Sequence, residues 1–177
     1  VNEWKQDNEV NFLRLGLNSM QQYRMKFILG KITAYVDALR LGKTSAEELE
    51  QYTQTAVEIE HIMPQTCPCK SDYSITDEEF DVYINRLGNL TLLENTINKS
   101  IQNDSYSIKS QAYKQSKFYL TSALSELVNQ DQNTAITRTN EILTSWDIWS
   151  RTAIEERQKM LYDLSERIWD IKAEANN

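Results

Sequence analysis

The chain contains few of the residues that interrupt helices. Its 177 residues include two prolines and four glycines, where average usage of about 5% and 7% would give roughly nine and twelve. No apolar run approaches the roughly 18 residues that a membrane-spanning helix needs. These absences exclude collagen-like, low-complexity and membrane-spanning proteins. They favour one mostly helical domain with a single core.

The scarce residues are concentrated in one short segment. The single histidine, both prolines and both cysteines lie within nine residues, at His61, Pro64, Cys67, Pro68 and Cys69. Two cysteines separated by one residue make a poor disulfide, and with one histidine they leave a zinc site short of its four ligands. We interpret them as thiols in a reducing cytoplasm. The segment therefore marks a break in a helical chain.

The ends and the charge of the chain suggest its context. The polar N-terminus, VNEWKQDNEV, is no signal peptide and lacks an initiator Met, so we expect a segment of a longer protein or a processed form of one. A net charge of −7 argues against a protein that coats nucleic acid. The one basic stretch, residues 99–119, holds four lysines against a single Asp104 and is interleaved with aromatic residues. A local contact with nucleic acid remains open.

The hydrophobic pattern predicts helices on both sides of a small strand–loop–strand insert. Apolar residues at helical spacing indicate the helices, and capping boxes that begin at Thr44 and Thr76 mark the starts of two of them. The alternation of apolar and polar residues around Val57 and Ile59 indicates the first strand. Three tryptophans near the C-terminus are expected in the core, and Arg157 on a solvated face. The expected helices are 20–41, 45–52, 77–86, 105–115, 118–129, 134–145 and 151–174, and the expected strands are 54–62 and 89–93.

The insert contains the residues best suited to catalysis. Glu60 and His61 adjoin each other near the end of the first strand, and Pro64 favours ending that strand. A carboxylate can bind a hard divalent cation, and a neutral imidazole can accept a proton from water. Asn89 and Asn98 could orient the imidazole or ligate the cation. Spacing alone does not separate these roles from those of turn or cap residues.

The motifs VEIEHIMPQ and NRLGNLTLLENTINKS resemble those of HNH (His-Me finger) nucleases. They are most similar to the C-terminal nuclease domain of GmrSD-type modification-dependent restriction enzymes and of SspE-like phage-defence effectors. In those proteins the domain follows an N-terminal ParB-like nucleotidase. The later run of Tyr106, Lys109, Tyr113 and Ser116 also matches, and the resemblance covers most of residues 20–175.

The resemblance implies a cytoplasmic, metal-dependent endonuclease that cleaves double-stranded DNA in restriction or phage defence. It implies His61 as the general base, Asn89 as the residue that orients it, and Glu60 and Asn98 as ligands of Mg²⁺ or Mn²⁺. Asn95 or Asn103 could replace Asn98. Lys99, Lys109 and Lys114 would lie on the helix after the finger and contact DNA phosphates.

The implied fold is mainly α, with a ββα-metal finger inside a helical bundle. We expect one nuclease domain over residues 1–177, with a helical part at 1–53, the finger at about 54–104 and a second helical part at 105–177. Three other interpretations stay open: a non-catalytic helical interaction module, a ribonuclease or colicin-like toxin, and a zinc module built on Cys67, Cys69 and His61. A toxin that acts alone is usually basic, which the net charge disfavours.

Overall fold

A computed structural model describes residues 2–44, 46, 48–66, 70–128 and 134–169. Within these ranges the chain is mainly helical and contains one two-stranded antiparallel sheet. Across the described residues, no helix is long and apolar enough to cross a membrane. The predicted sites at Cys67 and Cys69 lie outside the described residues. The helices are α1 (Asn2–Phe12), α2 (Gln22–Arg40), α3 (Glu50–Thr53), α4 (Asp77–Asn85), α5 (Asn95–Ile101), α6 (Tyr106–Tyr113), α7 (Tyr119–Ser122), α8 (Thr134–Asn140) and α9 (Arg151–Ile168).

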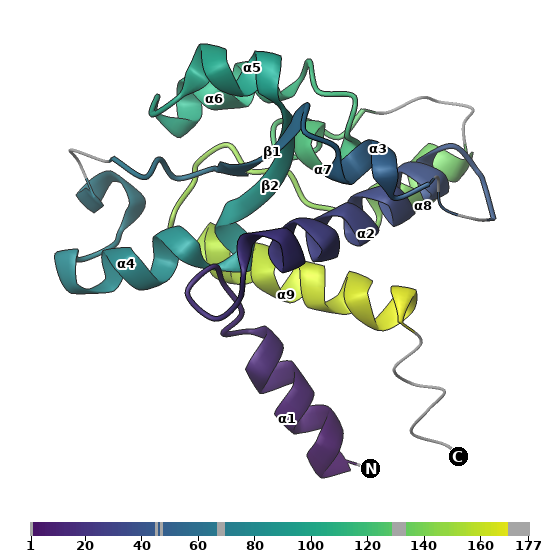
Figure 1. Cartoon of the computed structure of the whole chain (residues 1–177), viewed down its shortest axis with the longest axis horizontal. Helices are drawn as coiled ribbons and strands as arrows, with labels where there is room; N and C mark the ends of the chain where they lie inside the picture. Colours follow the sequence, from purple (N-terminus) through teal and green to yellow (C-terminus); the bar gives the residue numbers. More distant parts are fainter. Residues whose placement is uncertain (1, 45, 47, 67–69, 129–133, 170–177) are drawn as a thin grey trace.

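The sheet pairs β1 (Val57–His61) with β2 (Leu90–Glu94), and His61 faces Leu90 in the register. Short 3₁₀ turns η1 (Lys70–Tyr73) and η2 (Leu87–Asn89), together with α4, connect the two strands. Because α5 follows β2 directly, the order β1–β2–α5 is that of the predicted ββα finger. Figure 1 shows this hairpin between α5 and α6 on one side and α2 and α9 on the other.

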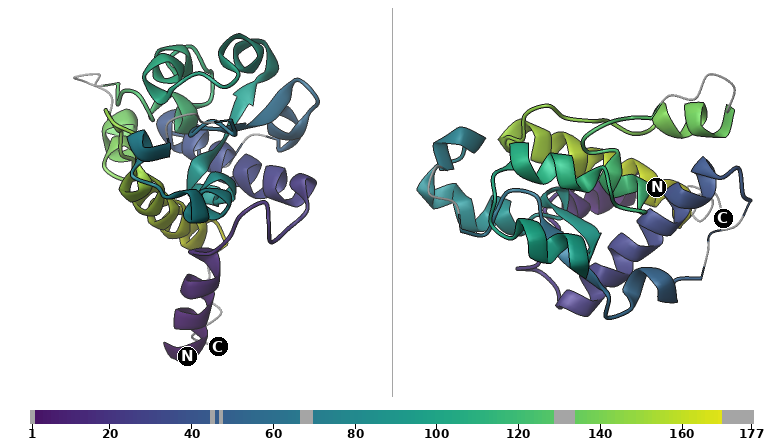
Figure 2. Two further views of the ribbon diagram at one scale, coloured as in Figure 1. Left: turned by 90° about the vertical axis from the view of Figure 1, so that its left-hand side faces the viewer. Right: turned by 90° about the horizontal axis from the view of Figure 1, so that it is seen from above.

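The long helices α2 and α9 lie on one side of the hairpin, where α2 packs against β2 and α9 against η2. On α2, Met25, Leu29, Ile32 and Val36 are fully buried, and their alternating spacing of four and three residues places them on one face of the helix. Helix α2 ends where Gly42 adopts a positive φ of 66°, as expected of a glycine stop. Figures 1 and 2 show α1 projecting away from this body.

Helix α9 packs against η2 closely enough to exclude any side chain there. A Cβ added to Gly88 would lie 2.2 Å from the backbone oxygen of Ile154. Arg157, which the sequence placed on a solvated face, is instead fully buried. Its guanidinium donates to the carbonyl oxygens of Gly88 at 2.9 Å and Leu90 at 2.7 Å. The buried carbonyl oxygens at the start of β2 therefore give this buried cation hydrogen-bond partners in the core.

Other predictions for the helices are confirmed in part. The capping box of Thr76 and Glu79 is present at the start of α4. The predicted helix 118–129 is wrong in length, because within the described residues 118–128 only Tyr119–Ser122 is helical. The hydroxyl of Thr121 donates to the carbonyl oxygen of Leu92 at 2.6 Å, so this segment follows its contacts with β2. Trp149 is buried in the core, whereas Trp169 is 39% exposed, which corrects its expected role as a core anchor.

Candidate functional site

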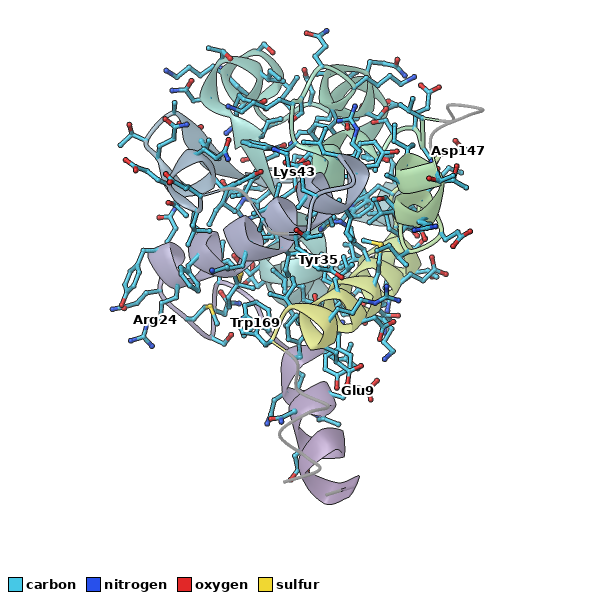
Figure 3. All side chains as sticks on the ribbon, turned by 90° about the vertical axis from the view of Figure 1, so that its right-hand side faces the viewer. Glu9, Arg24, Tyr35, Lys43, Asp147 and Trp169 are labelled. Carbon is cyan, nitrogen blue, oxygen red and sulfur yellow. The ribbon has the colours of Figure 1, made fainter. Side chains whose placement is uncertain are left out.

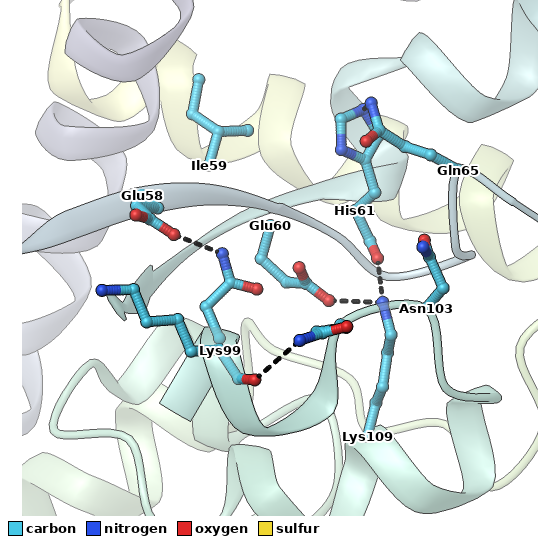
Figure 4. A pocket seen from close by; sticks show the side chains of 10 residues that line it. Glu58, Ile59, Glu60, His61, Gln65, Lys99, Asn103 and Lys109 are labelled. Atoms are coloured by element: carbon cyan, nitrogen blue, oxygen red, sulfur yellow. Dashed lines mark hydrogen bonds and ion pairs between the residues drawn. The ribbon is translucent and has the colours of Figure 1, made fainter. Parts of the chain in front are cut away.

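A polar cavity of about 320 Å³ lies beside β1 and α5, and Figure 4 shows the side chains around it. Six of the residues singled out from the sequence, with Asn103 among them, line this cavity. The cavity thus brings together residues almost fifty positions apart in the chain. Asn89 and Lys114 are not among the lining residues. Those that line the cavity are Glu58, Ile59, Glu60, His61, Gln65, Asn98, Lys99, Gln102, Asn103 and Lys109.

Glu60 is held by two donors from α6. Its Oε1 accepts hydrogen bonds from the Lys109 ammonium at 2.6 Å and from the Tyr113 hydroxyl at 2.9 Å. Lys109 and Tyr113 are four residues apart, so they lie on one face of α6. Burial raises the pKa of Glu60, and the ion pair with Lys109 opposes this shift. The carboxylate therefore reaches the cavity in a fixed orientation, with Oε2 free of these two bonds.

The side chain of Lys109 contacts both Glu60 and His61 and is buried rather than on the surface. Its ammonium also donates to the backbone oxygen of His61 at 2.7 Å, and its side chain is 1% exposed. This corrects the expectation that Lys109 contacts DNA phosphates, because α6 packs onto the end of β1 and encloses the charge. Burial lowers the pKa of Lys109, and Glu60 opposes that shift.

His61 is the last residue of β1 and presents a neutral imidazole. Burial, and next the positive charge of Lys109, lower the pKa of His61 to about 4, while a hydrogen bond with the Asn85 side chain opposes the shift. Gln65 Nε2 lies 3.5 Å from Nε2 of the ring. Figure 4 shows the ring on the side of β1 opposite Glu60 and Lys109, as strand alternation requires. The two motif side chains thus flank the end of the strand.

Asn89 fixes the chain just after His61 rather than the imidazole itself. It is completely buried. Its Oδ1 accepts from the Met63 backbone N–H at 2.8 Å and from the Trp149 indole N–H at 2.9 Å, while its Nδ2 donates to the backbone oxygens of Met63 and Ile84. The expected direct contact with the ring is therefore corrected. The ring's asparagine partner is Asn85, at the end of α4.

The oxygen donors on the α5 side of β1 suit a hard divalent cation. Glu58 and Glu60 share one face of the strand by their spacing of two, and the Asn98 amide donates to Oε2 of Glu58 at 2.7 Å. That bond leaves the amide oxygen of Asn98 as a potential ligand. Among the described residues, no three His, Cys, Asp or Glu side chains form a metal-binding group. Mg²⁺ requires fewer, since one or two carboxylates with waters suffice.

The remaining predicted residues separate into those near the cavity and those away from it. Asn103 lines the cavity, and its side chain accepts from the Thr66 backbone N–H at 3.4 Å, whereas Asn95 does not line it. Lys99 is exposed on α5 and also lines the cavity. Lys114 follows the end of α6 and lies 3.3 Å from Glu126 in a surface ion pair. The three lysines therefore do not share one helix.

Sequence reasoning gave no role to Glu58, Gln65, Asn85 or Tyr113. The strand period could have found Glu58, because it is two residues from Glu60 on β1. Helical spacing could have paired Tyr113 with Lys109 on α6. No local pattern indicates that Asn85, at the end of α4, faces His61 across the loop.

The comparison with family models agrees with this geometry. The model of the GmrSD restriction endonucleases, C-terminal domain, matches residues 5–164. The chain belongs to this family. The match makes it an HNH-type nuclease domain and includes every residue of the site. No curated protein and no solved structure matched the chain.

Proposed function

We propose that this GmrSD-family domain is a divalent-metal-dependent endonuclease that hydrolyses phosphodiester bonds of double-stranded foreign DNA. One observation carries the proposal: His61, whose imidazole is neutral, lines the same cavity at the end of β1 as the carboxylates of Glu58 and Glu60 and the amide of Asn98. These are the groups that metal-assisted hydrolysis of a phosphodiester requires. The membership of the HNH-type family supports the same reaction.

In this mechanism His61 is the general base. The imidazole accepts a proton from the water that attacks phosphorus, and the bond to the leaving 3′-oxygen breaks. Asn85 bonds the side chain of His61 and would select the tautomer whose free nitrogen faces the water. Asn89 acts on His61 indirectly, because it binds the backbone of Met63, two residues after His61.

Glu60, Asn98 and Glu58 are the residues that would hold the cation. Mg²⁺ fits their oxygen donors best, and Mn²⁺ accepts the same set. When bound, a divalent cation supplies stabilisation of the negative charge that builds up at the phosphate. Lys109 and Tyr113 hold Glu60 in the orientation this requires, since both bind its Oε1.

The acidic domain would depend on a partner for much of its affinity for DNA. Lys99 beside the cavity and Lys114 beyond α6 supply local phosphate contacts, while the chain as a whole carries a net charge of −7. An N-terminal ParB-like nucleotidase domain of the parent protein fits that role, and restriction or phage defence fits the family.

A plasmid-nicking assay tests the proposal. We expect cleavage with Mg²⁺ or Mn²⁺ and none with EDTA. His61→Ala should lower the rate by at least about 10²–10⁴-fold, the usual contribution of a positioned acid or base, without loss of DNA binding. Asn98→Ala should raise the Mg²⁺ concentration needed for half-maximal cleavage, whereas Asn11→Ala, an exposed control on α1, should not.

Two results would contradict the proposal. One is cleavage by His61→Ala at the wild-type rate. The other is absence of metal-dependent cleavage by folded protein, both as this chain and as part of the parent protein. That second result would favour the non-catalytic helical interaction module.

A further inference from the structure

A second cavity, of about 480 Å³, continues the open surface from the candidate site to α2. It is lined by Glu58 and Ile59, which also line the first cavity. Its other lining residues come from the start of α2 and from the segment before β1: Gln22, Tyr23, Lys26, Thr55 and Val57. The two cavities are therefore neighbours that share the middle of β1.

The first half of α2 is unusually basic for this chain. Arg24, Lys26 and Lys31 occur in it, and no acidic residue appears from position 22 to position 36. Arg24 and Lys26 lie in the first turns of the helix, where the positive end of the helix dipole makes a cation unfavourable and an anion favourable. Arg24 and Lys26 thus disfavour the helix at its start, but they raise the positive potential beside the second cavity.

Two exposed aromatic rings lie among these cations. Tyr23 is 65% exposed and Phe27, one turn later, is 44% exposed. The Arg24 guanidinium lies 5.8 Å from the centre of the Tyr23 ring, and the Lys31 ammonium lies 5.8 Å from that of Phe27. Figure 3 shows Arg24 pointing outward from the surface. Basic side chains combined with exposed rings are typical of surfaces that follow a nucleic acid strand.

We infer that this α2 surface, made of Tyr23, Arg24, Lys26, Phe27 and Lys31, binds the DNA strand as it leaves the candidate site. The cations contact backbone phosphates, and the rings stack on sugars and unpaired bases. The inference rests on the proposed nuclease function and extends it. It assigns the DNA a binding surface that begins at Glu60 and His61 and continues along α2. Charge complementarity selects the occupant: α2 carries three cations with no acidic residue from position 22 to position 36, against the one carboxylate, Glu58, that lines the second cavity. An anionic polymer matches this excess of positive charge.

The test measures DNA binding separately from cleavage. Fluorescence anisotropy would follow a labelled duplex with a single-stranded overhang, bound by the His61→Ala chain over a range of salt concentrations. The test variant carries Arg24→Gln, Lys26→Gln and Lys31→Gln. The matched control carries Arg14→Gln, Arg138→Gln and Arg167→Gln, which remove the same charge from exposed residues that line neither cavity.

We expect the test variant to bind at least about tenfold more weakly and to lower the salt slope by about 2–3, since each lost phosphate contact removes about 0.9. The control should change both values little. Tyr23→Ala should weaken binding to the overhang while Tyr23→Phe restores it, because stacking requires the ring and not the hydroxyl.

The outcomes separate this inference from the proposed function. If test and control variants keep the same affinity and slope while the wild type cleaves DNA, the α2 surface is not part of the DNA-binding surface and the nuclease function stands. If folded wild-type protein neither binds nor cleaves DNA, both as this chain and as part of the parent protein, both proposals are overturned.

Discussion

The contact between Glu60 and Lys109 is the most consequential pair of side chains in the domain. Both groups are almost completely buried, at 6% and 1% side-chain exposure, and their charged atoms are 2.6 Å apart. A buried ion pair adds little net stability over apolar residues, because desolvation offsets the attraction. Loss of one partner is different, since the other charge then stays buried and unpaired. The pair therefore fixes geometry more than it stabilises the fold.

Lys109→Met should lower the free energy of unfolding by about 3–5 kcal/mol, the usual cost of breaking a buried pair. Urea unfolding measures this, and Lys99→Met on the exposed surface of α5 serves as the control, with an expected change within about 0.5 kcal/mol. The double variant Glu60→Gln with Lys109→Met should recover part of the loss. Equal stability of Lys109→Met and wild type would show that the pair is not ionised in the folded protein.

At the level of single residues, the sequence indicated the chemistry but not all of the contacts. Glu60, His61 and Asn98 line one cavity, and the roles assigned to them stay predictions. Burial reverses the expected role of Lys109, because a basic stretch in the sequence does not reveal which lysine faces inward. The hydrogen-bond partners of Asn89 and Asn85 could not be predicted from the sequence either, since they depend on how α4 is placed relative to β1.

Among the elements, the junction of α9 with η2 holds the second strand of the finger in place. Gly88 lies against the backbone of α9, and Gln158 accepts a hydrogen bond from its backbone N–H. Arg157 donates to two carbonyls beside it. A helix more than sixty residues later in the chain thus positions the start of β2.

Gly88→Ala should lower the free energy of unfolding by about 1–3 kcal/mol or more, because the new Cβ overlaps a backbone atom that cannot rotate away. Chemical denaturation measures the loss. Gly30→Ala is the matched control on α2, where the nearest atom is Cδ1 of the Leu49 side chain at 3.1 Å and alanine also favours the helix by up to about 1 kcal/mol. A Gly88→Ala protein as stable as Gly30→Ala would mean that α9 can move away from η2.

Element type was largely predictable from periodicity, and length was not. The strands, α2 and the capped start of α4 follow from local signals in the sequence. The short α7 does not, because scarcity of glycine and proline permits a helix without requiring one. There the hydroxyl of Thr121 bonds to β2, and contacts between distant segments decide where the helix ends.

At the scale of the whole molecule, Asp37 connects the long helix α2 to the segment after α6. Its Oδ1 accepts from the backbone N–H of Tyr119 at 2.8 Å. Burial raises the pKa of Asp37 from 3.8 to about 6. The folded protein therefore binds this proton more tightly than the unfolded chain does. Between about pH 4 and pH 6 the contribution of Asp37 to stability falls as pH rises, and above pH 6 it is constant.

Asp37→Asn should consequently gain stability relative to wild type as pH rises from 4 to 6, by up to about 3 kcal/mol. The asparagine can still accept from Tyr119, so the comparison isolates the charge. Thermal or urea unfolding of both proteins at several pH values measures the difference. A difference that is independent of pH would show that Asp37 titrates normally in the folded state.

The bond between Asn89 and Trp149 gives the domain an internal optical probe. The indole N–H and the Met63 backbone N–H share one amide oxygen, and Trp146 lies edge-on to Trp149 with ring centres 5.4 Å apart. Ordering of the chain beside His61 is thus coupled to the environment of a pair of indoles. Near-ultraviolet circular dichroism of those indoles would report loosening of the loop after β1 even in a variant that cleaves nothing.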